Sequence, residues 1–81
     1  MIDYERWINR AISKTGGIKE GSFFVLKDLF DGIEWNELEN GEKRELGRRF
    51  KYLVKNKMVP YVDYNDKAPN NSARYRKKEQ L

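Results

Sequence analysis

The sequence predicts one α+β domain, and three observations lead to that class. Apolar residues recur at helical spacing in residues 4 to 14 and again in the basic segment 41 to 58. Residues 59 to 78 instead alternate strand-forming and polar residues around a turn. The chain of 81 residues, 38% hydrophobic and 14% aromatic, suffices for a single core and is not of the disordered class. We expect one domain over residues 1 to 81, with a basic flexible tail from about residue 77.

The first helix is expected over residues 4 to 14. Asp3 is placed to cap the free amides of the first turn, and Ile2 and Trp7 are spaced as a hydrophobic staple. Gly16-Gly17 supplies the backbone freedom that ends the helix. The residues that share its apolar face are Tyr4, Trp7, Ile8, Ala11 and Ile12.

Residues 23 to 41 are expected to form short elements. The contiguous Phe23-Phe24-Val25 suits a short buried strand, and Leu26 to Phe30 suits a short helix. Residues 31 to 41 contain the breakers Asp31-Gly32 and Asn40-Gly41 on either side of a large apolar residue, Trp35. We therefore expect a packed turn or a single helical turn there, with Trp35 as its anchor in the core.

The basic segment 41 to 58 is expected to be a helix with two distinct faces and Asn40 as its cap. The face toward the core holds Leu46, Phe50, Leu53, Val54 and the stem of Lys57. Another face, about 60 degrees wide, holds Arg44, Arg48, Lys51 and Lys55. Four like charges in successive turns repel one another, so this pattern favours contact with an anion. The alternative is a charged face that only contacts water.

The C-terminal third is expected to be a hairpin of residues 59 to 64 and 72 to 78, joined by a mobile loop. Pro60 suggests an edge strand or a strand start. Strand alternation places Tyr75 and Lys77 on one face, with Arg74 and Arg76 on the other.

The order of these elements, with a basic third helix before a hairpin, is that of a winged helix-turn-helix domain. Positive charge collects on the third helix and the hairpin, the two elements that touch nucleic acid in that architecture. Residues 1 to 40 hold five basic and eight acidic groups, whereas residues 41 to 81 hold twelve and five. One departure is that about ten residues separate Phe30 from the basic helix, more than the usual three- or four-residue turn.

The composition argues against several other functions. The chain has no Cys and no His, which removes disulfides, the commonest transition-metal ligands and the usual general base near neutral pH. We expect neither an enzyme nor a cofactor or metal site. No apolar run approaches the ~20 residues that span a bilayer, and the start MIDYERW is unlike a basic secretory leader. We expect a cytoplasmic protein without a membrane partner.

The run FFVLKDLFDGIEW, followed by EKRELGRRFKYLV, resembles a family of small proteins from Gram-positive bacteria and their mobile elements, long regarded as of unknown function. The shared pattern is F-x-LKDLF, then W, then R-x-LG-x-x-F. Members carried by staphylococcal cassette chromosomes, beside replication genes, are single-stranded-DNA-binding proteins with a winged-helix fold. The resemblance covers residues 23 to 54 closely and the hairpin more loosely. Its matching positions are mainly fold residues, so it implies the fold more directly than the activity.

The leading hypothesis is sequence-tolerant binding of single-stranded DNA in support of replication or transfer of a mobile element. Cations would neutralise phosphates, and exposed tyrosines would stack on unpaired bases. Tyrosines of a small hairpin can instead cover the core, and the RYRKK run can be a frayed basic tail. The candidate residues are Arg44, Arg48, Arg49, Lys51, Lys55, Tyr61, Tyr64, Arg74, Tyr75, Arg76, Lys77 and Lys78.

Two other functions stay open. A duplex-DNA regulator would read base edges with Arg44, Arg48 and Lys51, although no Asn or Gln lies on that face. An adaptor would dock on a replicative helicase or polymerase through the acidic first half of the chain. Its candidate residues are Asp28, Asp31, Glu34, Glu37 and Glu39, which match no metal-binding spacing and can equally be solvated surface.

Overall fold

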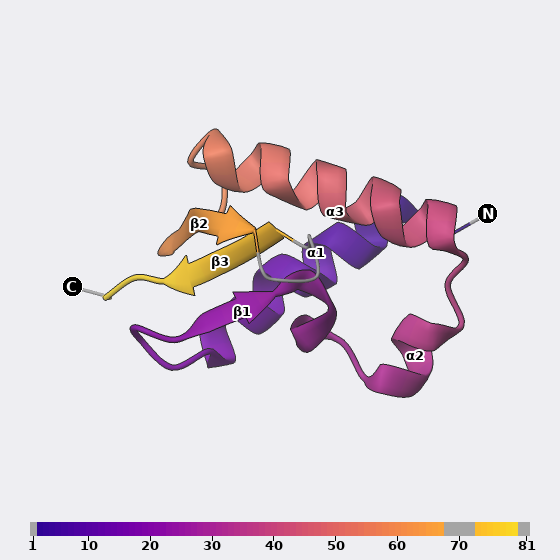
Figure 1. Cartoon of the computed structure of the whole chain (residues 1–81), viewed down its shortest axis with the longest axis horizontal. Helices are drawn as coiled ribbons and strands as arrows, with labels where there is room; N and C mark the ends of the chain where they lie inside the picture. The colour runs from indigo at the N-terminus through magenta and orange to yellow at the C-terminus, as the bar shows by residue number, and fades with distance from the viewer. Residues whose placement is uncertain (1, 68–72, 80–81) are drawn as a thin grey trace.

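The computed structural model describes residues 2–67 and 73–79, and it is an α+β domain with three α-helices and a three-stranded antiparallel sheet (Figure 1). The sheet order is β1-β3-β2, so the last strand of the chain lies in the middle. The elements are α1 (Tyr4–Lys14), η1 (Thr15–Gly17), β1 (Phe23–Val25), η2 (Leu26–Leu29), α2 (Gly32–Asn36), α3 (Asn40–Lys55), β2 (Val62–Lys67) and β3 (Ala73–Lys77).

Helix α1 has the predicted bounds and the predicted cap. The Asp3 carboxylate accepts a hydrogen bond of 3.2 Å from the Arg6 amide, which satisfies one free donor of the first turn. At the other end the Thr15 hydroxyl donates to the Ile12 carbonyl at 2.6 Å, and one 3-10 turn follows. The two glycines lie within that 3-10 turn.

The middle of the chain is confirmed as short elements, with one error. Phe24 is buried in β1, but Phe23 is 54% exposed, so the strand is covered on one face only. The expected short helix after β1 is the 3-10 turn η2, and the expected helical turn is α2. Trp35 is half-buried, and its ring stacks on that of Phe30 with 5.8 Å between ring centroids. This contact fixes α2 to the core.

Helix α3 buries Leu46, Phe50 and Val54, as the spacing predicts, but both of its ends differ from expectation. The cap position is Glu39 instead of Asn40, and the Glu42 carboxylate accepts from the Glu39 amide at 2.9 Å. The helix ends at Lys55 because Lys57 has a φ of 61°, which a helix cannot continue through. The Lys57 side chain is exposed and not part of the core.

The hairpin is shifted along the sequence and is not an isolated ribbon. Strand β2 begins at Val62 after the turn residue Tyr61, whose φ is 59°, and it continues to Lys67 through residues expected to be loop. Residues 68–71 of the expected mobile loop, and Ser72 of the expected second strand, lie outside the described residues. Strand β3 also pairs with β1, with Phe24 opposite Tyr75. Sequence periodicity carries no signal for that long-range pairing.

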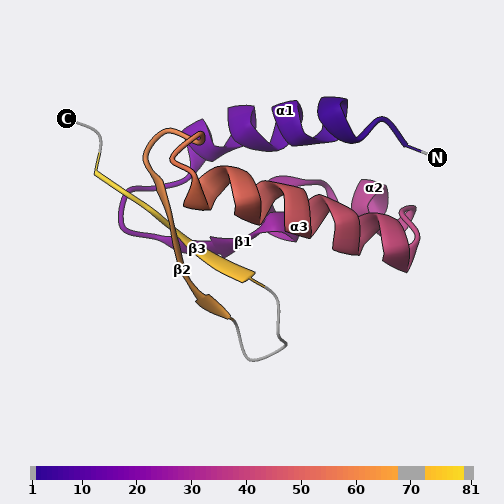
Figure 2. The same cartoon turned by 90° about the horizontal axis from the view of Figure 1, so that it is seen from above.

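The helices and the sheet enclose one core. Helices α1 and α3 lie side by side, and the sheet packs against α3 (Figure 2). The Tyr75 ring of β3 meets the Phe50 ring of α3 edge-on, with 5.0 Å between centroids. The sheet therefore has an inner face toward α3 and an outer face away from it. None of the helices in the described ranges is long and apolar enough to cross a membrane.

Candidate nucleic-acid interface

The basic face of α3 points outward, on the side of the helix next to β2. We call its four cations, Arg44, Arg48, Lys51 and Lys55, the α3 stripe. All of them are exposed except Lys51, which is half-buried. Arg44 forms no ion pair with any residue of the described ranges, so its charge is available to an external anion.

The geometry of the α3 stripe is best defined at Tyr64 of β2. The ammonium groups of Lys51 and Lys55 lie 4.9 Å and 5.0 Å from the centroid of the Tyr64 ring. The electron-rich ring attracts both cations, and this attraction offsets the repulsion between like charges one turn apart. The Tyr64 ring is itself held edge-on against Tyr75, with 6.0 Å between centroids. Two positive charges are thus kept together by an aromatic residue anchored to the core.

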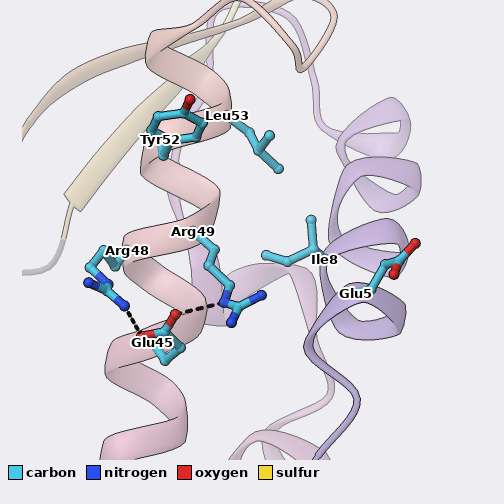
Figure 3. Close-up of a pocket in the computed structure, with 7 residues that line it drawn as sticks. All are labelled: Glu5, Ile8, Glu45, Arg48, Arg49, Tyr52 and Leu53. Atoms are coloured by element: carbon cyan, nitrogen blue, oxygen red, sulfur yellow. Dashed lines mark hydrogen bonds and ion pairs between the residues drawn. The ribbon is translucent and has the colours of Figure 1, made fainter.

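Arg48 and Arg49 are tied to the same carboxylate. Both guanidinium groups donate to Glu45, and the Arg49 contact measures 2.7 Å (Figure 3). These hydrogen bonds lower the pKa of Glu45 below its usual value, and the bond from Arg49 contributes more than the bond from Arg48. The Arg49 guanidinium also lies 4.6 Å from the centroid of the Tyr4 ring. Exposed ion pairs contribute little to stability, so a phosphate can compete with Glu45 for Arg48.

A groove of about 610 Å³ lies between α1 and α3, beside this ion-pair cluster (Figure 3). Its apolar wall is formed by Ile8 of α1 and Leu53 of α3, which point toward each other across the gap. Arg49 points into the gap, whereas Arg48 points away from α1. Of the α3 stripe, Arg48 lines this groove, whereas Arg44, Lys51 and Lys55 are not among its lining residues.

Two predicted site residues are buried, and the expectation that they are exposed is wrong. Tyr75 is 0% exposed because its ring fills the space between the sheet and Phe50, and this burial raises the pKa of its hydroxyl. Lys77 is 2% exposed, and its ammonium donates to the Thr15 carbonyl at 2.6 Å. Neither side chain can reach a nucleic acid in this conformation.

Arg74 and Arg76 lie on the outer face of the sheet, because they alternate with the inward-facing Tyr75. The predicted alternation along β3 is therefore confirmed. These two arginines therefore do not form one continuous surface with the cations of α3. Strand β3 lies beneath α3, so its outward side chains point away from that helix.

The remaining predicted residues, Tyr61 and Lys78, lie at the base of the hairpin. Tyr61 is 40% exposed, and its carbonyl accepts from the Lys78 amide at 2.7 Å. The chain is thus still hydrogen-bonded one residue beyond Lys77, where the flexible tail was expected to begin. The ammonium groups of Lys57 and Lys78 each lie 3.7 Å from the Asp63 carboxylate.

Three of the five acidic residues considered for an adaptor surface have local roles. Asp31 accepts from the Ile33 amide at 2.8 Å, and Asp28 accepts from the Val25 amide at 3.1 Å. Glu34 pairs with Arg10 at 2.7 Å. No group of three or more potential metal ligands occurs among the described residues.

Two exposed aromatic residues, Phe23 and Tyr52, are absent from the residues predicted from the sequence, and Phe23 was expected to be buried. Three contiguous apolar residues, Phe23-Phe24-Val25, suggested a strand buried on both faces, whereas β1 is an edge strand with its outer face exposed. The signal available was the pair of arginines at alternate positions of β3, which indicates a polar outer face on any strand that pairs with it.

Comparison with known proteins supports the resemblance noted in the sequence. A solved structure described as SCCmec type IV LP1413, a nucleic acids binding protein, matches with a TM-score of 0.70 and 25% sequence identity, over 96% of this chain and 96% of that one. No curated protein matches the chain. The model of a family described as a domain of unknown function, DUF1413, matches residues 9–77, so the chain belongs to the DUF1413 family.

Proposed function

We propose that this protein is a non-enzymatic winged-helix protein that binds single-stranded DNA with little sequence preference and supports replication or transfer of a mobile element. Its principal contact is the α3 stripe. The observation that carries the proposal is that the ammonium groups of Lys51 and Lys55 both lie over the ring of Tyr64, a residue of the hairpin strand β2. The similarity to a nucleic acids binding protein over nearly the whole chain supports the same class of ligand.

The order of α2, a short connection and α3 supports the winged-helix assignment. Residues 37–39 join the two helices, which is the length of turn typical of a helix-turn-helix. Much of the sequence that separated Phe30 from the basic helix is accounted for by α2 itself. The hairpin of β2 and β3 would then be the wing.

Phosphate contact fits the α3 stripe better than base reading does. Lysine ammonium groups attract phosphates as point charges, whereas specific readout of adenine commonly uses Asn or Gln. Lys51 and Lys55 direct their charge along one side of the helix, where a sugar-phosphate chain can pass. The resulting affinity should depend strongly on salt and weakly on sequence.

The test is fluorescence anisotropy of a labelled thymidine oligomer titrated with protein at several salt concentrations. The slope of log affinity against log salt should be negative, by about 0.7 for each phosphate neutralised on a single strand. Lys51→Ala and Lys55→Ala should each make the slope shallower by about 0.7, and together by about 1.4. Lys27→Ala, which removes an exposed lysine of η2, is the matched control and should leave the slope unchanged.

Two results would refute the proposal. One is an affinity of the wild-type protein that does not change with salt. The other is a preference for duplex over single-stranded DNA of the same sequence, which would favour the duplex regulator. The three-residue connection between α2 and α3, typical of helix-turn-helix proteins that bind duplex DNA, is the observation that supports this second candidate.

A further inference from the structure

The outer face of the sheet combines cations with an exposed aromatic ring. The register pairs Phe23 with Arg76 and Val25 with Arg74, and paired residues on neighbouring strands point to the same face. Arg76 is also opposite Asp63 of β2. The face therefore carries the aromatic ring of Phe23 on the edge strand β1, two arginines on the central strand β3 and polar residues on β2. We call this set the outer sheet face.

Phe23 is a large apolar residue on this face, and its side chain is unusually exposed, at 54%. It is also held in place. The Arg74 guanidinium lies 5.2 Å from the centroid of the Phe23 ring, and it donates to the Asn65 side-chain oxygen at 3.2 Å. The planar guanidinium and the aromatic ring together form a surface of the kind on which unpaired bases stack.

The charge of the outer sheet face selects an anionic partner. Two acidic residues of β2 pair with β3, Asp63 opposite Arg76 and Asp66 opposite Arg74. The ammonium groups of Lys57 and Lys78 lie 3.7 Å from the Asp63 carboxylate. Arg76 is exposed and has no ion pair with a described residue. A purely apolar protein partner would leave the Arg76 charge without a counterion, whereas a phosphate would neutralise it.

We infer that the outer sheet face is a second contact surface for single-stranded DNA, in which one base stacks on Phe23 while Arg76 neutralises a neighbouring phosphate. Bases of a duplex are stacked on each other and cannot offer a face to Phe23, so this surface distinguishes single strands from duplexes. It lies on the opposite side of the sheet from α3. A strand bound to both surfaces must pass around an edge of the sheet. The inference rests on the proposed function.

The test compares Phe23→Ala with the wild-type protein on two labelled probes, a thymidine oligomer and an abasic oligomer with the same number of phosphates. Loss of one stacked base should weaken binding of the thymidine oligomer about five- to 150-fold. Binding of the abasic oligomer, which has phosphates but no bases, should be unchanged. Phe23→Trp should retain the affinity for the thymidine oligomer, because indole also stacks.

Two further variants separate the possible causes. Ile33→Ala removes an apolar side chain that is 76% exposed on α2, and it should change neither affinity. Arg76→Ala should weaken binding of both probes and make the salt slope shallower by about 0.7. Thermal melting of each variant identifies any loss that comes from unfolding.

The inference is overturned if the wild-type protein binds the thymidine oligomer and Phe23→Ala binds it equally well. Equal losses on both probes would also overturn it, since stacking requires a base. If the wild-type protein binds neither oligomer, the proposed function itself fails. If Phe23→Ala instead abolishes binding to a protein and leaves DNA binding intact, the outer sheet face is a protein interface.

Discussion

Lys77 should act on stability and not on nucleic-acid affinity. Its ammonium is buried on the inner face of the sheet and donates to the Thr15 carbonyl, 62 residues away in sequence. The same carbonyl accepts from the Ile18 amide at 3.1 Å. The lysine therefore joins the C-terminal strand to the end of the first helix, where a positive charge also complements the helix dipole.

The expected effect of Lys77→Ala follows from what the truncation removes. Three buried methylene groups contribute about 0.8 kcal/mol each. A hydrogen bond from a charged donor contributes about 1.5 to 3 kcal/mol, and relief from burying the ammonium offsets part of that amount. We expect a loss of about 2 to 4 kcal/mol out of a total stability of about 4 to 12 kcal/mol for a domain of this size. Lys77→Met keeps the apolar stem and should lose about 1 to 2 kcal/mol.

The assay is urea unfolding followed by the fluorescence of Trp7 and Trp35, with thermal melting in parallel. Lys77→Ala should lower the melting temperature by about 10 to 30 °C. Its oligomer affinity, measured where the variant is folded, should match the wild type in both magnitude and salt slope. Arg76→Ala, one position earlier and exposed, is the control and should change stability by less than about 0.5 kcal/mol.

The opposite pattern would refute this reasoning. A Lys77→Ala variant with wild-type stability and a salt slope shallower by about 0.7 would show that the ammonium contacts a phosphate and not the Thr15 carbonyl.

Two other variants test the site and the core. Glu45→Gln should free Arg48 and Arg49 from their ion pairs, so anisotropy should show tighter binding and a steeper salt slope. The hydrogen bonds from the two arginines lower the pKa of Glu45. In the wild-type protein the ion pairs are therefore complete above the usual carboxyl pKa and are lost as the pH falls through the lowered value. An unchanged affinity would show that neither arginine contacts the strand. Burial raises the pKa of Tyr75, so unfolded molecules ionise first and stability should fall as the pH rises above about 10. Tyr75→Phe should remove that residue's share of the alkaline loss, measured by urea unfolding at a series of pH values, and equal alkaline losses in both proteins would contradict its assignment to Tyr75.

Local elements could be predicted because their signals are local. Helix α1 and the core side of α3 follow from apolar spacing over several turns, and the Asp3 cap follows from residue chemistry at one position. The ends of α3 were less predictable. A cap at Glu39 and a left-handed Lys57 depend on how the chain enters and leaves the packed helix.

The errors at Tyr75 and Lys77 arise because long-range packing decides which face of β3 is buried. Alternation predicted that Tyr75 and Lys77 share a face, but it could not say which face is buried, because that depends on the position of α3. Lysine is rarely fully buried, so its burial at Lys77 had no sequence signal. The sequence made Tyr61 and Tyr64 equal candidates for stacking on a base. In the structure the Tyr64 ring lies beside the ammonium groups of Lys51 and Lys55.

The central position of β3 also determines when this protein can fold. The strand that completes both hydrogen-bonded ladders is synthesised after β1 and β2, so a nascent chain on the ribosome has those two strands but nothing to join them until Lys77 has emerged. A premature stop before residue 73 would therefore delete the middle of the sheet and the ring that fills the core, and it would yield an aggregation-prone fragment instead of a shortened domain.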